Sequence, residues 1–568
     1  MERNDAMNPE FTQRFPGIRY GAIGGVCLVI LSLIGMVEAF NQREIVSDVI
    51  TMGQTLLLAM AVFIAGLAAD RAGGGTRGLL TGAMSGVIMS ALLALLVLLG
   101  NAVNMRQVFI NASPALFQIL LFQQDGLAEG LGLLLLAGLL TGAAAGLTRM
   151  LPRRARSILI AASSTIVMVG LLQDTLSPIF SEWGPLAEIN EVLFPGNGLS
   201  IPGAIGLFVL VAGLRTAWSL KGDAARARVR ALPPAARRRL NLFALLVAVF
   251  VLLILPQILG LFLSEVLTII GLYIMLGLGL NIIIGFCGML DLGHVAYFAI
   301  GSYTIAILTS PELGFFHWSF WQALPVAIAI GSITGVLICT PVLKMRGDYL
   351  AITTLGFGEI IRLFVLSDFL RPWLGGAQGI GKIPKAEIAG FEFATPQQIY
   401  YLILAGCLLV GFIAWRLRDS RLGRSWMAVR EDEDVAQAMG INLVSTKIKA
   451  FAVGAGFSAL SGAIFATKLS SVYPHSFNVM ISINILCVII VGGVGSIPGV
   501  IVGAAALVGL PELLREFAEY RLLVYGAVLV AMMLLKPEGL WPEATHQREL
   551  HAEAAETVEP VAAAGGRG

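Results

Sequence analysis

Long apolar runs alternate with shorter polar segments along most of the chain. A helix needs roughly 20 apolar residues to cross the hydrocarbon core of a bilayer, and only helices and closed barrels satisfy their backbone hydrogen bonds there. Before residue 221 the pattern predicts about six membrane-spanning helices. The corresponding runs are Gly21–Val37, Val49–Ala69, Leu79–Leu99, Leu127–Leu147, Ser157–Leu172 and Ile201–Leu220.

The second half of the chain repeats this pattern with shorter and more glycine-rich runs, about ten of which are predicted to cross or nearly cross a membrane. They are Leu240–Leu261, Val266–Phe286, Leu290–Leu308, Trp321–Leu343, Tyr349–Leu366, Ile399–Trp415, Ile448–Leu469, Ile481–Val494, Gly495–Leu510 and Leu522–Leu535. Short runs interrupted by glycine indicate broken helices. The predicted fold is an all-α polytopic integral membrane protein, a multi-span helical bundle with broken or short helices in its C-terminal core.

The loops between the runs differ in charge. Arg71 and Arg77 follow the second run, four arginines lie between residues 149 and 156, and the basic stretch Lys221–Arg239 follows the sixth. The loop of residues 173–200 has four acidic residues and no lysine or arginine. Because cytoplasmic loops of membrane proteins are enriched in Lys and Arg, we expect the N-terminus, the arginine-bearing loops and the C-terminus to be cytoplasmic.

Composition supports a membrane protein and excludes other classes. Charged residues make up 13% of the chain and hydrophobic residues 57%, with a mean hydropathy of +0.84, whereas a soluble domain carries about twice that charged fraction. The basic residues are scattered over loops, which indicates no nucleic-acid partner. The five cysteines lie in apolar runs without a CxxC or Cys/His cluster, so we expect buried thiols, no metal and no cofactor.

The basic segment Lys221–Arg239, which contains Pro233 and Pro234, is the predicted boundary between two parts of the chain. We expect residues 1–220 to be an extra N-terminal transmembrane region and residues 221–239 a basic cytoplasmic linker near anionic lipid. Residues 240–541 are the expected second membrane domain, and residues 542–568 a disordered cytoplasmic tail. No motif in residues 1–220 indicates a catalytic site or a function.

The most densely charged segment, Arg416–Ala450, lies between long apolar runs. Apolar residues recur at three- and four-residue steps from Arg424 to Met439, which predicts one helix there. Gly440 is expected to end this helix, and Asn442 to cap the next one. The segment is either a solvated loop that supplies positive charge to the cytoplasmic side or a helix that a soluble partner reaches.

Glycines recur through the apolar segment Gly277–Tyr303, where they let helices approach closely or open the backbone onto a cavity. Asn281, Asp291 and His294 are polar groups beside these runs, and burying such groups without partners costs several kcal/mol. They are therefore either capping residues at the membrane interface or part of a translocation pathway.

Further pathway candidates lie between Met345 and Arg362, and they are Thr353, Thr354 and Glu359. Glu359 and Arg362 stand at positions i and i+3 of one predicted helix and are expected to pair. An acidic residue inside a membrane also suggests a proton relay. The alternative is a structural ion pair near the outer end of a span.

Two glycine-rich stretches resemble phosphate-binding loops only in part. In Gly376–Lys382, Ile383 follows the lysine where a Walker A motif has Ser or Thr, and no predicted strand precedes the loop. The stretch Val491–Gly499 has no lysine and predicts a tight turn between apolar runs. We therefore expect the chain to have no nucleotide site of its own and not to be an enzyme.

Six stretches that occur in family order cover roughly residues 260–541. They are GLGLNIIIGFCGMLDLGHVAYFAIGSY, RGDYLAITTLGFGEIIRL, GGAQGI, Asp434–Gly440, IIVGGVGSIPGVIVGA and KPEGL. Together they resemble the branched-chain amino acid ABC transporter permease family, specifically its LivM-type subunit. Among them, Asp434–Gly440 resembles the "EAA" loop of ABC-importer permeases, in which a short coupling helix sits in a groove of the ATPase subunit. Here Asp434 stands for the usual Glu.

The resemblance implies that residues 240–541 are the permease domain of a bacterial ABC importer in the cytoplasmic (inner) membrane. ATP-driven alternating access would then translocate Leu, Ile or Val. The implied partners are a second permease subunit, two ABC ATPase subunits, an extracytoplasmic solute-binding protein and membrane lipid. The residues that would couple to the ATPase are Arg430, Glu431, Asp434, Ala436 and Gly440. Small Ala436 would allow close approach to the groove wall.

Other interpretations remain. Met289-Leu290-Asp291 departs from the Gln-hydrophobic-Ser common in the family, which leaves urea, short amides or other amino acids as alternative substrates. A proton-coupled secondary transporter using Glu359 and Asp291 is an alternative of another class, although it would not need the Asp434–Gly440 loop. A third alternative makes residues 1–220 an independent lipid-contacting or scaffold module.

Overall fold

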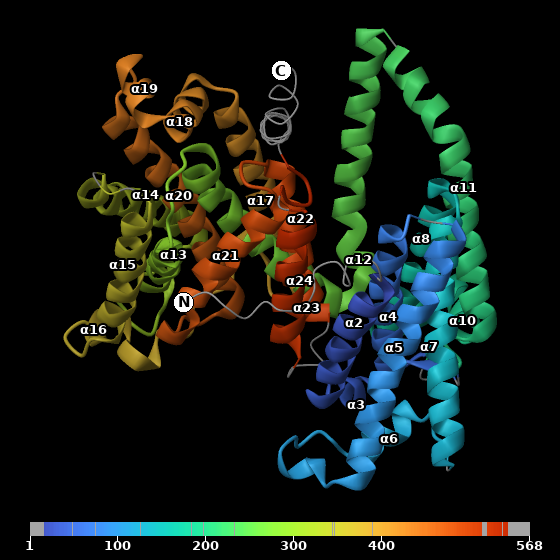
Figure 1. The fold of residues 1–568 in the computed structure, drawn as a ribbon. Helices are drawn as coiled ribbons and strands as arrows, with labels where there is room; N and C mark the ends of the chain where they lie inside the picture. Colours follow the sequence, from blue (N-terminus) through green and yellow to red (C-terminus); the bar gives the residue numbers. More distant parts are fainter. Residues whose placement is uncertain are drawn as a thin grey trace, which may run out of the picture. The chain divides into compact units, whose positions relative to one another are not determined.

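The computed structural model describes residues 16–542 except 48, 74, 125, 183, 197, 232, 344, 346, 389, 514–519 and 537, so the predicted tail lies almost wholly outside the described residues. Within them, 12 helices are long and apolar enough to cross a membrane. The described strands form two short hairpins, β1 (Glu44–Val46) with β2 (Ile50–Thr51) and β3 (Glu387–Ile388) with β4 (Phe391–Glu392). The predicted all-α polytopic class is confirmed (Figure 1).

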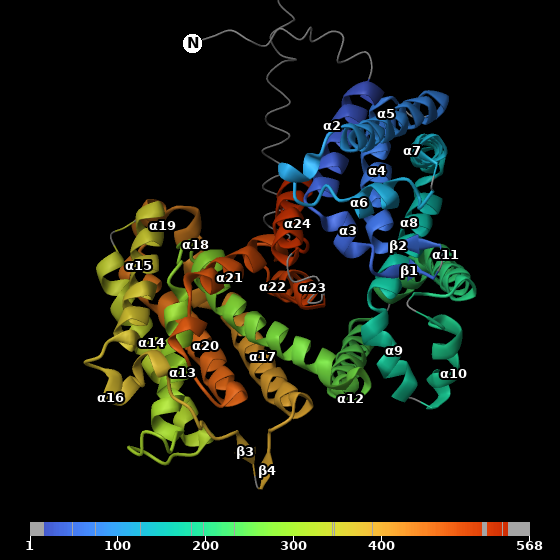
Figure 2. The same ribbon diagram turned by 90° about the horizontal axis from the view of Figure 1, so that it is seen from below.

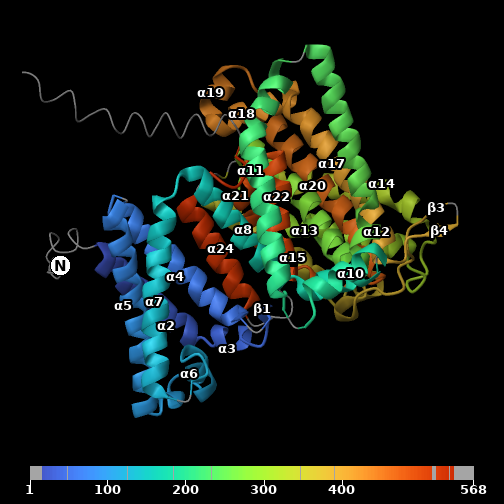
Figure 3. The ribbon, with the colours of Figure 1, turned by 90° about the vertical axis from the view of Figure 1, so that its right-hand side faces the viewer.

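The chain divides into two compact units, Met1–Ala248 and Val249–Gly568. In the first unit each of the six predicted runs corresponds to a helix, and α2, α4, α5 and α7 pack side by side (Figure 3). The helices are α2 (Pro16–Leu33), α3 (Met36–Phe40), α4 (Met52–Arg71), α5 (Gly75–Ala102), η1 (Met105–Gln107), α6 (Pro114–Leu120), α7 (Leu127–Met150), α8 (Arg153–Leu171), α9 (Gln173–Glu182), α10 (Gly184–Leu193) and α11 (Ile201–Ala231).

The second unit contains shorter and interrupted helices, as the glycine-rich runs predict. The elements that follow α11 are α12 (Pro234–Asn281), η2 (Ile282–Phe286), α13 (His294–Thr309), α14 (Phe320–Val342), α15 (Asp348–Leu366), α16 (Arg371–Leu374), η3 (Gly376–Gln378), α17 (Pro396–Arg418), α18 (Arg421–Glu431), α19 (Glu433–Ala438), α20 (Leu443–Leu469), η4 (Pro474–Ser476), α21 (Val479–Gly492), α22 (Ile497–Ala504), η5 (Ala505–Gly509), α23 (Leu510–Leu513) and α24 (Arg521–Leu535). Both η2 and η5 are π-helical turns, which commonly mark functional interruptions of a helix.

Helix α12 joins two runs that the sequence pattern separates. Its backbone breaks at Gly260, where φ is +71° and ψ is −170°, a conformation open to glycine alone among common residues. Pro256 lies one turn earlier and its carbonyl accepts a hydrogen bond from Gln397 Nε2 at 3.2 Å. The break therefore arises from the backbone conformation of Gly260. The side chain of Gln397 on α17 hydrogen-bonds to the Pro256 carbonyl, a backbone group that the break frees.

Helix α20 is the most buried long helix of the second unit, and α13 and α14 pack directly against it (Figure 2). The approach is so close that a Cβ atom at Gly462 would lie 2.0 Å from the Phe298 carbonyl oxygen. Ser302 Oγ crosses the same contact and donates to the Gly462 carbonyl at 2.8 Å. Membrane helices usually associate through small residues and serine hydroxyls, because lipid provides no hydrophobic driving force for helix association.

The end of the described chain returns to the turn between α21 and α22. The Leu540 amide donates to the Val491 carbonyl at 2.8 Å, and the Trp541 amide donates to the Gly492 carbonyl at 2.9 Å. Two stretches that the sequence analysis singled out separately, Val491–Gly499 and KPEGL, thus meet through their backbones. Their shared role is to close the bundle at this turn.

The close contact between α13 and α20 predicts that Gly462→Ala destabilises the protein. Overpacking a filled core costs about 1–3 kcal/mol, and here the added methyl meets backbone that cannot rotate away. The midpoint of thermal unfolding in detergent should fall. Gly411→Ala on α17 is the matched control, since its Cβ would meet no heavy atom within 4 Å and its helix propensity should improve by about 0.5–1 kcal/mol. Equal shifts for both variants would contradict the packing argument.

Candidate subunit-coupling site and buried polar cluster

The charged segment between α17 and α20 forms two helices rather than the single helix predicted from Arg424 to Met439. The prediction is wrong at Asp432, which is extended with φ −157° and ψ 115°. Its carboxylate accepts hydrogen bonds from the amides of Asp434 at 2.8 Å and Val435 at 2.9 Å, so it caps α19. The break follows from this cap, which the surrounding run of acidic residues conceals in the sequence.

Gly440 and Asn442 act as predicted. Gly440 has a φ of +87°, and the Ile441 amide donates back to the Ala436 carbonyl, which together end α19. The side chain of Asn442 then accepts from the Ser445 amide at 3.0 Å and caps α20. The chain therefore reverses direction within a few residues.

Two side chains of α18 fix it to the rest of the unit. Trp426 is fully buried, and its Nε1 donates to the Thr446 carbonyl at the start of α20 at 2.9 Å. Arg430 Nη1 donates to the Gly285 carbonyl in the π-helical turn η2 at 2.7 Å. Because α20 and η2 are different elements, any displacement of α18 acts on both.

Helix α19 is tied to α20 by an ion pair. Lys447 Nζ lies 2.7 Å from Glu433 Oε1, and the lysine side chain is only 6% exposed. A buried ammonium group needs such a partner, since an unpaired charge there is strongly unfavourable.

One exposed face of α19 is apolar. Val435 is 58% exposed and Met439 79% exposed, one turn apart on the same face. Ala436 differs from the expectation, because it is 3% exposed and belongs to the unit's own core. It packs α19 inward and does not present its methyl group to a partner.

A polar cavity of about 330 Å³ lies beside this segment. Arg430, Glu431 and Asp434 line one side, and the loop from Cys287 to Met289 lines another. Burial raises the pKa of the Cys287 thiol to about 12, so it stays protonated at neutral pH and offers neither a nucleophile nor a metal ligand. No group of three or more metal-ligating side chains occurs in the described part of the chain. Where α18 and α19 line the cavity, its wall is charged.

Three of the predicted pathway residues meet at the start of α13. Asp291 and His294 are completely buried. One Asp291 oxygen accepts from the Gly293 amide at 2.9 Å, and the other lies 3.4 Å from His294 Nδ1. Thr354 Oγ1 accepts from the Leu292 amide at 3.0 Å, which joins α15 to the same loop. These contacts join the turn before α13 to α15, and α13 has no side-chain cap at its N-cap residue, Gly293.

Two serines of this cluster were missed by the sequence analysis. Ser482 Oγ accepts from the Val295 amide at 2.9 Å, and Ser458 Oγ donates to the His294 carbonyl at 3.2 Å. His294 Nε2 has no hydrogen-bond partner among the described residues. The available signal was the run of small residues around Ser458, which is typical of a buried helix crossing.

The other predicted residues lie outside this cluster. Asn281 Oδ1 accepts from the Gly495 amide at 2.9 Å and so links η2 to the turn before α22. Thr353 Oγ1 donates to the Tyr349 carbonyl within α15. Arg362 Nε donates to Glu359 Oε2 at 2.7 Å, as the i, i+3 spacing predicts, and both side chains are about one-third exposed.

The Glu433–Lys447 pair predicts that Glu433→Gln loosens α19. The substitution leaves the buried Lys447 ammonium without its charged partner, at a cost of about 2 kcal/mol. Amide hydrogen exchange over residues 433–440 should accelerate. Glu431→Gln is the control, because the Glu431 side chain is 61% exposed beside Arg430 and such a surface pair is worth less than about 1 kcal/mol. Faster exchange in the control, or none in Glu433→Gln, would refute the anchoring role.

Comparison with known proteins assigns this part of the chain to a family. Residues 262–533 match the model of the branched-chain amino acid transport system permease component. The high-affinity branched-chain amino acid transport system permease protein LivM of Salmonella typhimurium (strain LT2) is 37% identical over 309 residues, which are 50% of this chain and 71% of the relative. LivM of Escherichia coli (strain K12) is also 37% identical, over 51% of this chain and 72% of its own length.

A more distant relative comes from an archaeon. The probable branched-chain amino acid transport permease protein LivM of Methanocaldococcus jannaschii is 24% identical over 49% of this chain and 93% of its own length. No solved structure matches this chain. The family model matches no residue before 262, so the whole N-terminal unit, Met1–Ala248, lies outside the match. From residue 262 to residue 533, the chain belongs to the branched-chain amino acid ABC transporter permease family and is of the LivM type.

Proposed function

We propose that this chain is one transmembrane subunit of a bacterial ABC importer that translocates Leu, Ile and Val by ATP-driven alternating access. Relatives that bear the name of high-affinity branched-chain amino acid transport permeases support the substrate class. The observation that carries the mechanism is the exposed apolar face of α19, Val435 with Met439, on a segment otherwise anchored to the unit's interior. Exposed apolar groups beside a polar cavity are typical of a docking surface.

In this proposal α18 and α19 form the element that docks on an ATPase subunit. Arg430, Glu431 and Asp434 contact it at the rim of the cavity, Gly440 sets the return of the chain, and Ala436 holds α19 against the core. ATP hydrolysis belongs to two separate ATPase subunits. The remaining partners are a second permease subunit and an extracytoplasmic solute-binding protein. The arginine-bearing loops and both termini then lie on the cytoplasmic side of the inner membrane.

The anchors of the segment define how motion would pass inward. A displaced α19 acts on α20 through the Glu433–Lys447 pair, and a displaced α18 acts on η2 through Arg430. Helix α20 contacts the polar cluster through Ser458. We infer that the cluster of Asp291, His294 and Thr354 forms a closed gate together with Ser458, and that the contact with Ser458 breaks when α13 and α20 slide apart in the inward-facing state.

The other pathway candidates have supporting roles in this proposal. Asn281 would hold η2 to the turn before α22, while Thr353 and Glu359 would face the cavity formed with the second permease subunit. In domain terms, residues 240–541 perform transport, residues 221–239 connect them to the N-terminal region of residues 1–220, and residues 542–568 are the proposed cytoplasmic tail. Since α11 and α12 extend into residues 221–239, the connection is largely helical.

The docking proposal predicts that Met439→Asp weakens retention of the ATPase subunits. A carboxylate placed at an apolar contact must lose its hydration without a partner, so binding should weaken at least roughly tenfold, or by about 1.4 kcal/mol. The variant should replace the natural chain in the source cell. ATPase co-purification and uptake of labelled leucine should both fall, while the amount of the chain in the membrane stays normal.

Gln437→Asp is the matched control for this test. Gln437 is exposed and stands on the opposite side of α19 from Val435 and Met439, so the same charge is added without entering the apolar face. It should leave co-purification and uptake close to those of the natural chain. If both variants, or neither, lost the ATPase, the apolar face of α19 would not be the docking surface.

A further inference from the structure

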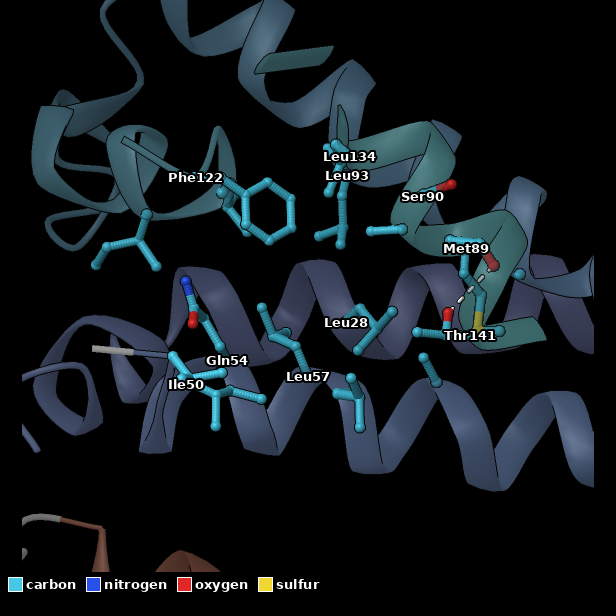
Figure 4. A pocket seen from close by; sticks show the side chains of 18 residues that line it. Leu28, Ile50, Gln54, Leu57, Met89, Ser90, Leu93, Phe122, Leu134 and Thr141 are labelled. Carbon is cyan, nitrogen blue, oxygen red and sulfur yellow. Dashed lines mark hydrogen bonds between the residues drawn. The ribbon is translucent and has the colours of Figure 1, made fainter. Parts of the chain in front are cut away.

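A cavity of about 240 Å³ lies within the N-terminal unit, between α2, α4, α5 and α7 and beneath α6. Its lining is dominated by aliphatic side chains, with one aromatic ring and three polar side chains (Figure 4). The family match begins after this unit, and the proposed transport function assigns no role to it. The cavity is therefore a separate feature of the chain.

The close packing of α5 and α7 explains where the cavity begins. A Cβ atom at Gly86 would lie 2.0 Å from the Gly138 carbonyl oxygen, so the two backbones touch at this level. Toward α6 the facing residues become large, and Leu93 and Leu134 line the cavity wall. The helices are held together at one end and leave space at the other.

The chemistry of the lining is almost purely apolar. No Asp, Glu, Lys, Arg or His contributes to it. Ser90 and Thr141 donate their hydroxyls to carbonyls of their own helices, those of Val87 and Gly138. Gln54 Oε1 accepts from the Thr51 amide at 3.2 Å, which leaves Gln54 Nε2 as the donor without a partner among the described residues.

This lining excludes a free amino acid as the occupant. An amino acid brings an ammonium and a carboxylate group, and neither would find a charged partner in the cavity. Burying such groups without partners is strongly unfavourable. A hydrocarbon chain has no polar groups to desolvate, so it can pack against the apolar lining without that cost. A single hydrogen-bond acceptor on the chain would satisfy Gln54 Nε2.

One end of the cavity is covered by a residue in a strained conformation. Phe122 and Gln123 both have positive φ, +57° and +58°, in a region that non-glycine residues rarely adopt. The Phe122 amide donates to the Ile119 carbonyl at 3.2 Å and the Gln123 amide donates to the Gln118 carbonyl at 2.8 Å, which hold the turn. Figure 4 shows the Phe122 ring opposite Gln54 across the cavity. Backbone strain held in this way is typical of ligand-binding sites.

We propose that this cavity binds one acyl chain of a membrane phospholipid, with Gln54 Nε2 donating to the ester carbonyl and the Phe122 ring covering the chain. The surrounding helices are candidate membrane spans, so the bilayer supplies this ligand at high local concentration. The exposed outer surfaces of these helices, such as Leu80 and Leu136, contact the same lipid without selecting it. The cavity thus distinguishes a bound lipid from the bulk lipid around it.

The test uses the full chain, delipidated in detergent, with a phosphatidylcholine that carries a photoreactive diazirine in its acyl chain. After illumination, peptide mass spectrometry should find saturable labelling at Leu57, Leu93 and Leu134. Unlabelled phosphatidylcholine should compete, and free leucine should not. Labelling that never saturates and falls only on exposed residues such as Leu136, or labelling that free leucine displaces, would overturn the proposal.

Two kinds of variant sharpen this test. Ala61→Phe and Ala137→Phe each add a ring inside the cavity and should abolish the saturable labelling, whereas Leu136→Phe on the exposed face of α7 should leave it unchanged. Gln54→Leu should keep the labelling but lose the preference for an ester-linked over an ether-linked phosphatidylcholine as competitor. The thermal unfolding midpoint of each variant shows that it is folded. Persistent labelling in both filled variants, or an unchanged ester preference in Gln54→Leu, would contradict the assignment.

Discussion

The second unit depends on the direct backbone contact between α20 and its neighbours. With no side chain between Gly462 and Phe298, the two helices cannot move apart slightly; they are either packed or separated. Lipid provides no hydrophobic force to hold them, so the contact rests on van der Waals packing and on hydrogen bonds such as that from Ser302 to Gly462. Such an interface would suit the alternating access proposed above.

Helix α20 is also held at both ends. At its start, the Thr446 carbonyl and the Lys447 ammonium receive α18 and α19. At its end, Lys468 Nζ lies 2.5 Å from Glu265 on α12, and Lys385 Nζ donates to the Lys468 carbonyl. Burial lowers the pKa of Lys385, which lies in the segment between η3 and β3. Helix α20 is therefore anchored at each end and closely packed along its length.

The sequence was sufficient to predict the class, the positions of most spans and the local end signals. Apolar run length located the long helices, and Gly440 and Asn442 act at the helix ends as their side-chain chemistry requires. The prediction failed at Asp432, since four acidic residues in a row give no indication of which one caps a helix. Burial of Ala436 was also missed, because a helix of six residues is too short for its periodicity to show which face is buried.

The polar cluster shows a different limit. Asp291 and His294 were identifiable as unusual polar residues, but Ser458 and Ser482 are more than 160 positions away in sequence and resemble ordinary small residues of a helix crossing. Only the tertiary structure shows that both serines hydrogen-bond to backbone groups in the first turn of α13. The spacing of residues along the sequence also does not reveal that His294 Nε2 lacks a hydrogen-bond partner among the described residues.

Glycine contacts between helices have opposite consequences in the two units. Around α20 they bring backbones together near buried serine hydroxyls and a buried Asp–His pair. Around α5 and α7 the contact ends beneath α6 in a cavity without ionisable side chains. An amino acid could not cross such a cavity without losing the hydration of both its charged groups. This cavity is therefore unsuited to an amino acid, and its chemistry matches a hydrocarbon chain.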